Sequence, residues 1–199
     1  MNIIIKKHFL LYKGYKLKCS IGKSGISHLK REGDLKTPKG QFRLGLLYYR
    51  KDRIKSLKCF IKKKVIKKNM GWCNDSRSKK YNQEVSLPFK YGAEKIYRKD
   101  NIYDIFINIK YNHSPILKGK GSAIFLHLST KKYKATSGCV ALLKKDFLKI
   151  IPLINNSTKI LIKKNFFFLK LKSLILSRLI DLIRLAQNLS SCPCLVLSD

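Results

Sequence analysis

The sequence AIFLHL fills residues 123–128 and is apolar at every position except His127. A short apolar run of this kind is typical of a strand that is buried on both faces. Further along the chain, TSGCVAL at residues 136–142 places Cys139 directly after a glycine and before a second apolar run. The stretch therefore predicts a buried strand that carries a histidine, followed by a tight glycine turn that carries a cysteine.

His127 and Cys139 suggest nucleophilic chemistry, because a short basic loop joins them and their side chains can meet in space. Attack by a thiol requires the thiolate, and a neighbouring imidazole either takes the proton or forms an ion pair with the sulfur. Backbone N–H groups around the turn at Ser137 and Gly138 would stabilise an oxyanion. The pair alone is weak support for an active site, because a buried structural cysteine is the commoner role.

A second segment strengthens the case. REGDLKTPKGQF at residues 31–42, taken together with residues 136–142, resembles the L,D-transpeptidase (YkuD-type) family. That family has an early Gly-Asp-x-x-Thr-Pro-x-Gly-x-Phe element, then a His, a variable loop and Ser/Thr-His-Gly-Cys. GWCND at 71–75 and GKGSAIFLH at 119–127 are further similar to a stand-alone branch of the family. The resemblance covers about residues 1–163.

The resemblance implies a mainly β, sandwich-like catalytic fold with short helices and no metal or organic cofactor. It makes Cys139 the nucleophile and His127 the base, with Gly138 and Ser137 completing the site. It also implies that the backbone carbonyl of Leu128 accepts the ring N–H and orients the imidazole.

Two positions depart from the family pattern. Ser137 stands where the family has a histidine, and Ala141 stands where it has Arg or Asn. Loss of the arginine removes a group that would bind a substrate carboxylate. We expect a lysine of the short basic loop, Lys131, Lys132 or Lys134, to take its place.

The implied reaction is two-step acyl transfer on peptidoglycan stem peptides, through a thioester on Cys139. Two alternatives stay open. One is an L,D-carboxypeptidase or related cysteine peptidase that uses the same pair with water as the acceptor, and the other is a non-catalytic basic protein that binds nucleic acid or a membrane. The family implies a periplasmic or cell-envelope location, although charge interrupts the N-terminus before a standard signal peptide develops.

The composition is strongly basic, with 44 Lys+Arg against 11 Asp+Glu and a net charge of +33 over 199 residues. This excess indicates an anionic neighbour such as a wall polymer or a membrane surface. Lysine outnumbers arginine and is spread along the chain, so we expect no nucleic-acid partner. The six cysteines form no disulfide framework and the four histidines show no metal-ligand spacing.

Period-two patterns predict most of the remaining elements. Strands are expected at residues 3–5, 16–21, 42–49, 103–109 and 158–163, with a turn-rich stretch at 22–40, a surface loop at 70–89 and a helix at 144–155 that Pro152 ends or kinks. Apolar residues at spacings of three and four predict an amphipathic helix in the tail. We therefore divide the chain into a catalytic domain at 1–163 and a helical tail of unknown role at 164–199.

A few other conspicuous residues have plainer interpretations. His8, His28 and His113 lie in polar contexts and are expected at the surface. Asp34 is expected to form the turn before Pro38. Trp72 is predicted either to line the substrate cleft or to anchor a packed loop, and Cys73 is expected to be structural.

Overall fold

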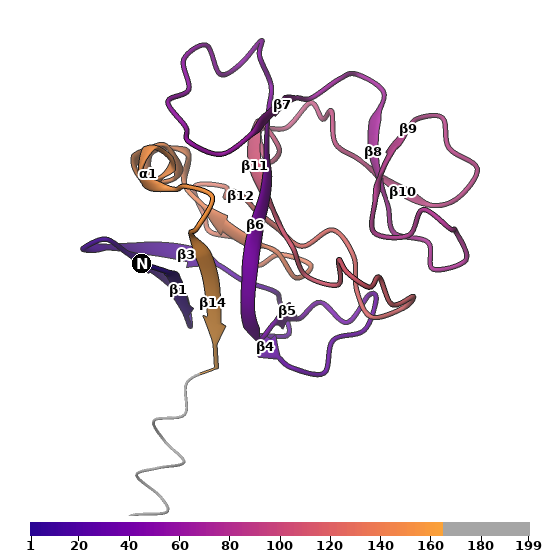
Figure 1. Ribbon diagram of the computed structural model, residues 1–199, viewed down its shortest axis with the longest axis horizontal. Coiled ribbons are helices and arrows are strands. Elements are labelled where there is room, and N and C mark those ends of the chain that lie inside the picture. The colour runs from indigo at the N-terminus through magenta and orange to yellow at the C-terminus, as the bar shows by residue number, and fades with distance from the viewer. Residues whose placement is uncertain (165–199) are drawn as a thin grey trace, which may run out of the picture. The chain divides into compact units, whose positions relative to one another are not determined.

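The computed structural model describes residues 1–164, and it is mainly β, as the sequence predicts (Figure 1). The strands are β1 (Ile3–Lys6), β2 (Phe9–Tyr12), β3 (Tyr15–Ser20), β4 (Ile26–Ser27), β5 (Thr37–Pro38), β6 (Gly40–Tyr49), β7 (Lys63–Val65), β8 (Met70–Cys73), β9 (Glu84–Ser86), β10 (Ala93–Lys95), β11 (Ile105–Ile109), β12 (Phe125–Leu128), β13 (Val140–Leu142) and β14 (Lys159–Lys163). One α-helix, α1 (Lys144–Ile150), leads into the 3-10 turn η1 (Ile151–Leu153).

The main sheet has nine strands in the order β11-β12-β13-β3-β2-β1-β14-β6-β7. An additional antiparallel pairing joins β11, the first strand of this order, to the long strand β6, the last but one, so that eight of the strands form a closed circuit and β7 lies outside it. Its two halves therefore face each other across one core, and few backbone edges are left open. The mainly β class predicted from the sequence is confirmed.

Helix α1 packs its buried residues Phe147 and Ile150 into this core. The predicted helix at 144–155 is shorter than expected, because the chain tightens into η1 at Ile151. Pro152 stands in the first turn of η1, where its missing N–H costs no hydrogen bond. The expectation that Pro152 limits the α-helix is therefore correct.

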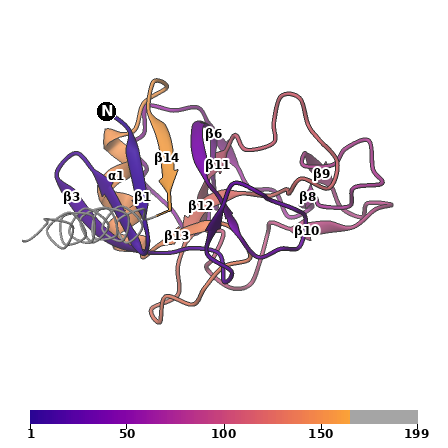
Figure 2. The ribbon, with the colours of Figure 1, turned by 90° about the horizontal axis from the view of Figure 1, so that it is seen from below.

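The surface loop predicted at residues 70–89 is wrong. Residues 70–73 form strand β8, all four of them buried, and β8 is the centre of a small sheet in the order β10-β8-β9. Trp72 packs edge-on against Tyr48 and Phe125, within a second apolar cluster. The small sheet lies at the opposite end of the domain from α1 in both ribbon views (Figures 1 and 2). Strand β8 has only four residues, and packing against residues distant in sequence, such as Tyr48 and Phe125, makes it a core strand.

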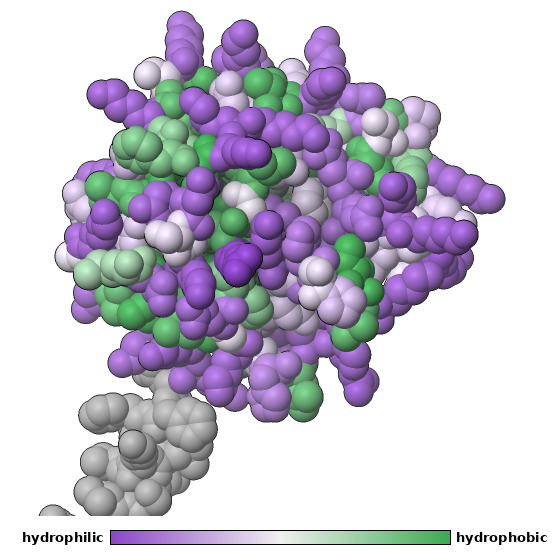
Figure 3. Space-filling view, in the orientation of Figure 1, coloured by the Kyte–Doolittle hydropathy of each residue, from purple (hydrophilic) through white to green (hydrophobic). Residues whose placement is uncertain are grey.

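Strands β12 and β13 are parallel neighbours, with Leu126 opposite Val140 and His127 opposite Ala141. The connection between them is the basic loop of residues 129–139. Hydrophilic side chains are spread over the visible face of the molecule and project from its outline (Figure 3). Within residues 1–164, no helix is long and apolar enough to cross a membrane. The predicted amphipathic helix at 164–199 falls, apart from Lys164, outside the described residues, and the domain boundary stays a prediction.

Candidate active site

The register of β12 and β13 brings His127 and Cys139 to one face of the sheet. His127 is opposite Ala141, and side chains alternate along a strand, so Cys139, two positions before Ala141, points to the same side as both. All three residues line one cleft of about 630 Å³. From strand spacings, the Cα atoms of Cys139 and His127 are roughly 8 Å apart, a separation that two converging side chains can bridge.

The turn before Cys139 depends on Gly138. Its φ is +139°, and a Cβ atom there would lie 2.8 Å from the Lys36 carbonyl oxygen, so only glycine fits. Thr136 fastens the turn, because its hydroxyl donates to the Cys139 carbonyl at 2.6 Å and accepts the Gly138 N–H at 3.2 Å. The Gly138 N–H is thus bonded within the turn. The role that the structure supports for Gly138 is to let the chain turn tightly, so that Cys139 comes close to the cleft.

The two sequence motifs, far apart along the chain, meet at this turn. Thr37 accepts the Gly22 N–H at 2.8 Å, and Gly22 forms a β-bridge with Thr136. Asp34 accepts the backbone N–H groups of Arg31 and Lys36, at 2.8 and 2.9 Å, and so shapes the loop that supports Gly138. The turn-forming role expected for Asp34 is confirmed, and the contact explains why the motifs occur together.

The His127 ring is held in one tautomer. Its Nδ1 lies 2.9 Å from the Leu128 carbonyl oxygen, and since a carbonyl only accepts, Nδ1 carries the proton and Nε2 keeps its lone pair. Burial lowers the pKa of His127 to about 4, while hydrogen bonds to the Leu128 and Ile102 carbonyls act in the opposite direction. At neutral pH the ring is therefore a neutral base.

Cys139 is also neutral in this arrangement. Burial, and to a smaller degree the charge of Glu94, raise the pKa of its thiol to about 12, although the Phe125 N–H and Lys30 act to lower it. The sulfur accepts the Phe125 N–H at 3.3 Å and donates to the Ala123 carbonyl at 3.1 Å. The geometry fits a thiol that turns toward His127 when substrate binds and loses its proton during attack. A hydrogen bond between a nucleophile and its base often tightens only in the substrate complex.

Another part of the cleft lining comes from β10 and from the loop that joins β10 to β11, which the sequence did not mark. Glu94 lies in β10, and Arg98, Ile102 and Tyr103 lie in the loop. Tyr103 packs its ring edge-on against His127, with 5.4 Å between ring centroids. No motif identifies these residues, and the density of charge between residues 94 and 104 was the only available signal.

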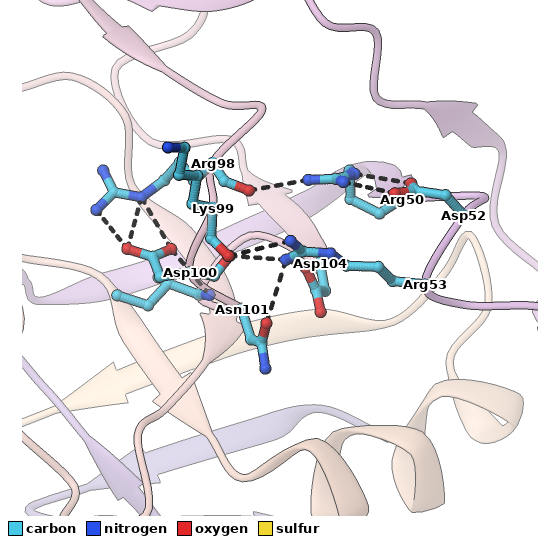
Figure 4. Close-up of polar contacts among 9 residues, drawn as sticks. Arg50, Asp52, Arg53, Arg98, Lys99, Asp100, Asn101 and Asp104 are labelled. Carbon is cyan, nitrogen blue, oxygen red and sulfur yellow. Dashed lines mark hydrogen bonds and ion pairs between the residues drawn. The ribbon is translucent and has the colours of Figure 1, made fainter.

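Polar contacts hold this loop in place (Figure 4). Arg53 donates to the carbonyls of Lys99 and Asp100 and to the carboxylate of Asp104, the last at 2.7 Å. Arg50 donates to the Arg98 carbonyl at 2.9 Å. Because a guanidinium group binds several acceptors at once, these two arginines hold residues 98–104 through several contacts.

Arg98 is the cation that the loop brings to the cleft. Its Nε and Nη2 form a fork with Asp100, and the guanidinium lies 5.8 Å from the centre of the Tyr103 ring. Of the lysines expected to replace the family's arginine, Lys134 lines the cleft, whereas Lys131 and Lys132 are exposed and do not line it.

The remaining residues singled out in the sequence have structural or surface positions. Ser137 is exposed and lines the cleft. Trp72 does not line the cleft, so it is a packed anchor. Cys73 is buried away from it, and His8, His28 and His113 are exposed. The four cysteines of the described part of the chain are free thiols, and no group of three or more His, Cys, Asp or Glu side chains there is arranged to hold a metal ion.

Comparison with known proteins agrees with this architecture. The family description for the L,D-transpeptidase catalytic domain (YkuD) matches residues 4–162, which is most of the chain. Neither the comparison with curated proteins nor that with solved structures gives a match. With the family description covering every strand from β1 to β14, the chain belongs to the L,D-transpeptidase family, whose members act on the stem peptides of peptidoglycan.

Proposed function

We propose that the protein catalyses L,D-transpeptidation through a thioester on Cys139. The observation that carries the proposal is the hydrogen bond of His127 Nδ1 to the Leu128 carbonyl, because it leaves Nε2 as a base in the cleft that Cys139 lines. The family match supplies the substrate class.

In the first step, Cys139 attacks the carbonyl between the diamino acid at stem position three and the terminal D-alanine. His127 Nε2 takes the thiol proton during attack, since both groups are neutral at rest. It then gives that proton to the departing amine of D-alanine, and the acyl group remains on the sulfur as a thioester. In the second step an acceptor attacks the thioester and regenerates the thiol.

Arg98 is proposed to bind a carboxylate of the donor stem, in place of the arginine that the family has two residues after its cysteine. Its Nη1 makes no hydrogen bond within the described residues, whereas Nε and Nη2 are occupied by Asp100. A guanidinium has donors to spare for a planar anion. Lys134, on the opposite rim of the same cleft, would add positive charge.

The reaction would take place at the cell envelope, where peptidoglycan lies. There the excess of basic residues would favour adsorption to an anionic wall polymer or membrane surface. Such adsorption weakens with salt, because exposed charges are screened within about 10 Å at 0.1 M ionic strength.

Two measurements test the proposal. Incubation with a carbapenem should add one adduct mass to the wild-type protein, and Cys139→Ser should lose it while Cys59→Ser keeps it. An adduct on Cys73, or none on folded protein, would contradict the assignment. Isolated sacculi should then gain L,D cross-links with wild-type protein and none with Cys139→Ala. Tripeptide stems as the sole product would mean that water is the acceptor and the protein a carboxypeptidase.

A further inference from the structure

Two carboxylates in the cleft are left without a cationic partner. Six acidic side chains of residues 1–164 form salt bridges, although basic residues outnumber acidic ones 44 to 11 in the whole chain. Glu32, Glu94 and Asp146 form none within that part of the chain. Asp146 lies in the first turn of α1, where a negative charge is favourable. Glu32 and Glu94 instead both line the cleft.

A tyrosine hydroxyl orients each of these two carboxylates. Tyr103 donates to Glu94 Oε1 at 2.7 Å, and Tyr81 donates to Glu32 Oε2 at 2.5 Å. The other oxygen of each carboxylate accepts no hydrogen bond from the described residues. Burial raises the pKa of Glu94, the Tyr103 hydroxyl and the charge of Arg98 act to lower it, and the charges of Asp100 and Glu32 add smaller upward effects.

Ser122 adds an independent observation at the same place. It lines the cleft, is 7% exposed, and its Oγ is a buried polar atom with no hydrogen-bond partner in the described structure. It is close enough to the Tyr81 hydroxyl to lower that phenol's pKa, yet the geometry does not complete a hydrogen bond. A buried polar group left unpaired is costly, and a bound ligand would satisfy it.

Two carboxylates and an unpaired hydroxyl in one cleft are a chemical complement to a primary ammonium group. We propose that Glu94, Glu32 and Ser122 form a subsite that binds the amine of the acceptor in the second step of the reaction. The inference rests on the proposed function, and it assigns residues to the acceptor, which neither sequence motif does. The nearby cations Lys30 and Arg98 are already engaged, by Asp34 and Asp100 respectively.

The chemistry of transfer balances in this arrangement. The ammonium gives one proton to a carboxylate of the subsite, and the neutral amine attacks the thioester carbon on Cys139. The amide C–N bond forms as the C–S bond breaks, and a second amine proton passes through His127 to the sulfur. Burial raises the pKa of Glu94, which makes it able to hold the first proton. Glu94, Ser122 and Cys139 line the same cleft, so an amine held by the subsite is in the space where the thioester forms.

The test compares acceptors that differ in one group. A stem tetrapeptide serves as donor, and the acceptor is D-methionine or the 2-hydroxy acid of the same shape, which has no ammonium. Glu94→Gln keeps the oxygen that accepts from Tyr103 and removes the charge. It should raise KM for D-methionine about 10- to 100-fold, the loss expected for a hydrogen bond to a charged group. Acylation of Cys139 by a carbapenem, and use of the hydroxy acid, should change less than about threefold.

Glu84→Gln is the matched control, because Glu84 also accepts from a tyrosine hydroxyl, that of Tyr48, yet does not line the cleft. An unchanged KM for D-methionine in Glu94→Gln would overturn the subsite. So would an equal loss of carbapenem acylation, since Glu94 would then act on the nucleophile. D-methionine should also bind to Cys139→Ala protein, as followed by NMR titration, and Glu94→Gln should weaken that binding. This binding measurement tests the subsite without any catalysis. It gives an answer even if the wild-type protein forms no carbapenem adduct and the proposed function fails.

Discussion

The two walls of the cleft are built in different ways. The wall that carries His127 and Cys139 consists of strands β12 and β13, whose residues are buried in the sheet. The facing wall is the loop from β10 to β11, which Arg50 and Arg53 hold through hydrogen bonds. The first wall is fixed by apolar packing and backbone ladders, and the second by a few polar contacts. This difference predicts that the acyl-transfer chemistry and the recognition of substrates can be damaged separately.

The largest effect should come from the base on the strand wall. His127→Ala should slow acylation of Cys139 by about 10²–10⁴-fold, the usual contribution of a positioned acid or base. The rate of carbapenem adduct formation measures it. His113→Ala, at an exposed position, should stay within a few-fold of wild type. An equal loss in the two variants would mean that His127 is not the base.

Gly138→Ala should be next in size. The new Cβ would lie 2.8 Å from the Lys36 carbonyl at a φ of +139°, so the turn must shift and carry the Cys139 sulfur with it. Strain of this kind costs about 1–3 kcal/mol, and we expect acylation to fall at least about tenfold. Gly119→Ala is the matched control, because Gly119 also has positive φ but open space around it. Equal acylation rates in the two variants would show that the turn tolerates a side chain.

Arg53→Lys tests the loop wall. Its effect should be smaller than that of Gly138→Ala and limited to the binding of the stem peptide. Lysine keeps a positive charge beside buried Asp104 but cannot bind Lys99, Asp100 and Asp104 together. KM for a stem tetrapeptide should rise several-fold, and the rate of carbapenem acylation should stay near wild type. If both change in parallel, the two walls are not independent. Thermal melts should accompany the kinetics, to separate a loss of recognition from a loss of folded protein.

The pH dependence should be shallow. With the His127 pKa near 4 and the Cys139 pKa near 12, the acylation rate should vary only a few-fold between about pH 5 and 9. No thiolate absorbance at 240 nm should appear over that range, whereas a resting thiolate–imidazolium pair would show it. The unfolded imidazole protonates near its ordinary value of 6.5, so stability from neutral His127 is complete above that pH. It is lost as the pH falls from 6.5 toward 4, which urea titrations at several pH values would detect.

Truncation should have the smallest effect. A chain that ends after Lys164 keeps the fourteen strands of residues 1–164, including β14 between β1 and β6. We expect its melting temperature to lie within a few degrees of the full-length value and its carbapenem adduct to be retained. Insolubility, or a fall of tens of degrees, would show that residues 165–199 belong to the folding unit.

The contrast between the walls also explains what the sequence could predict. An apolar run and a glycine turn mark the stretch that contains His127, Gly138 and Cys139. These local patterns were enough to predict the strand that carries His127 and the turn that carries Cys139. Strand β8 was missed because its burial comes from Tyr48 and Phe125, which are distant in sequence. Glu94 and Arg98 were missed for the same reason. Glu94 is placed by the pairing of β10 with β8, and Arg98 by the hydrogen bond that its carbonyl accepts from Arg50, rather than by any local pattern.

The crossover at residues 129–139 has a consequence for the evolution of substrate range. Its first part, residues 129–135, lies between β12 and the bridge that Thr136 forms with Gly22, so the length of this part can change without displacing the His127 base or the turn that carries Cys139. Lengthening a flexible loop is thermodynamically mild, about 0.6 kcal/mol for each doubling. Natural insertions and designed libraries can therefore change this part of the loop, and with it the path by which a substrate reaches the Cys139 sulfur. The loop of this chain is short and rich in lysine. Replacing it with a longer loop from another family member is a direct way to change which donor stem peptide the protein accepts.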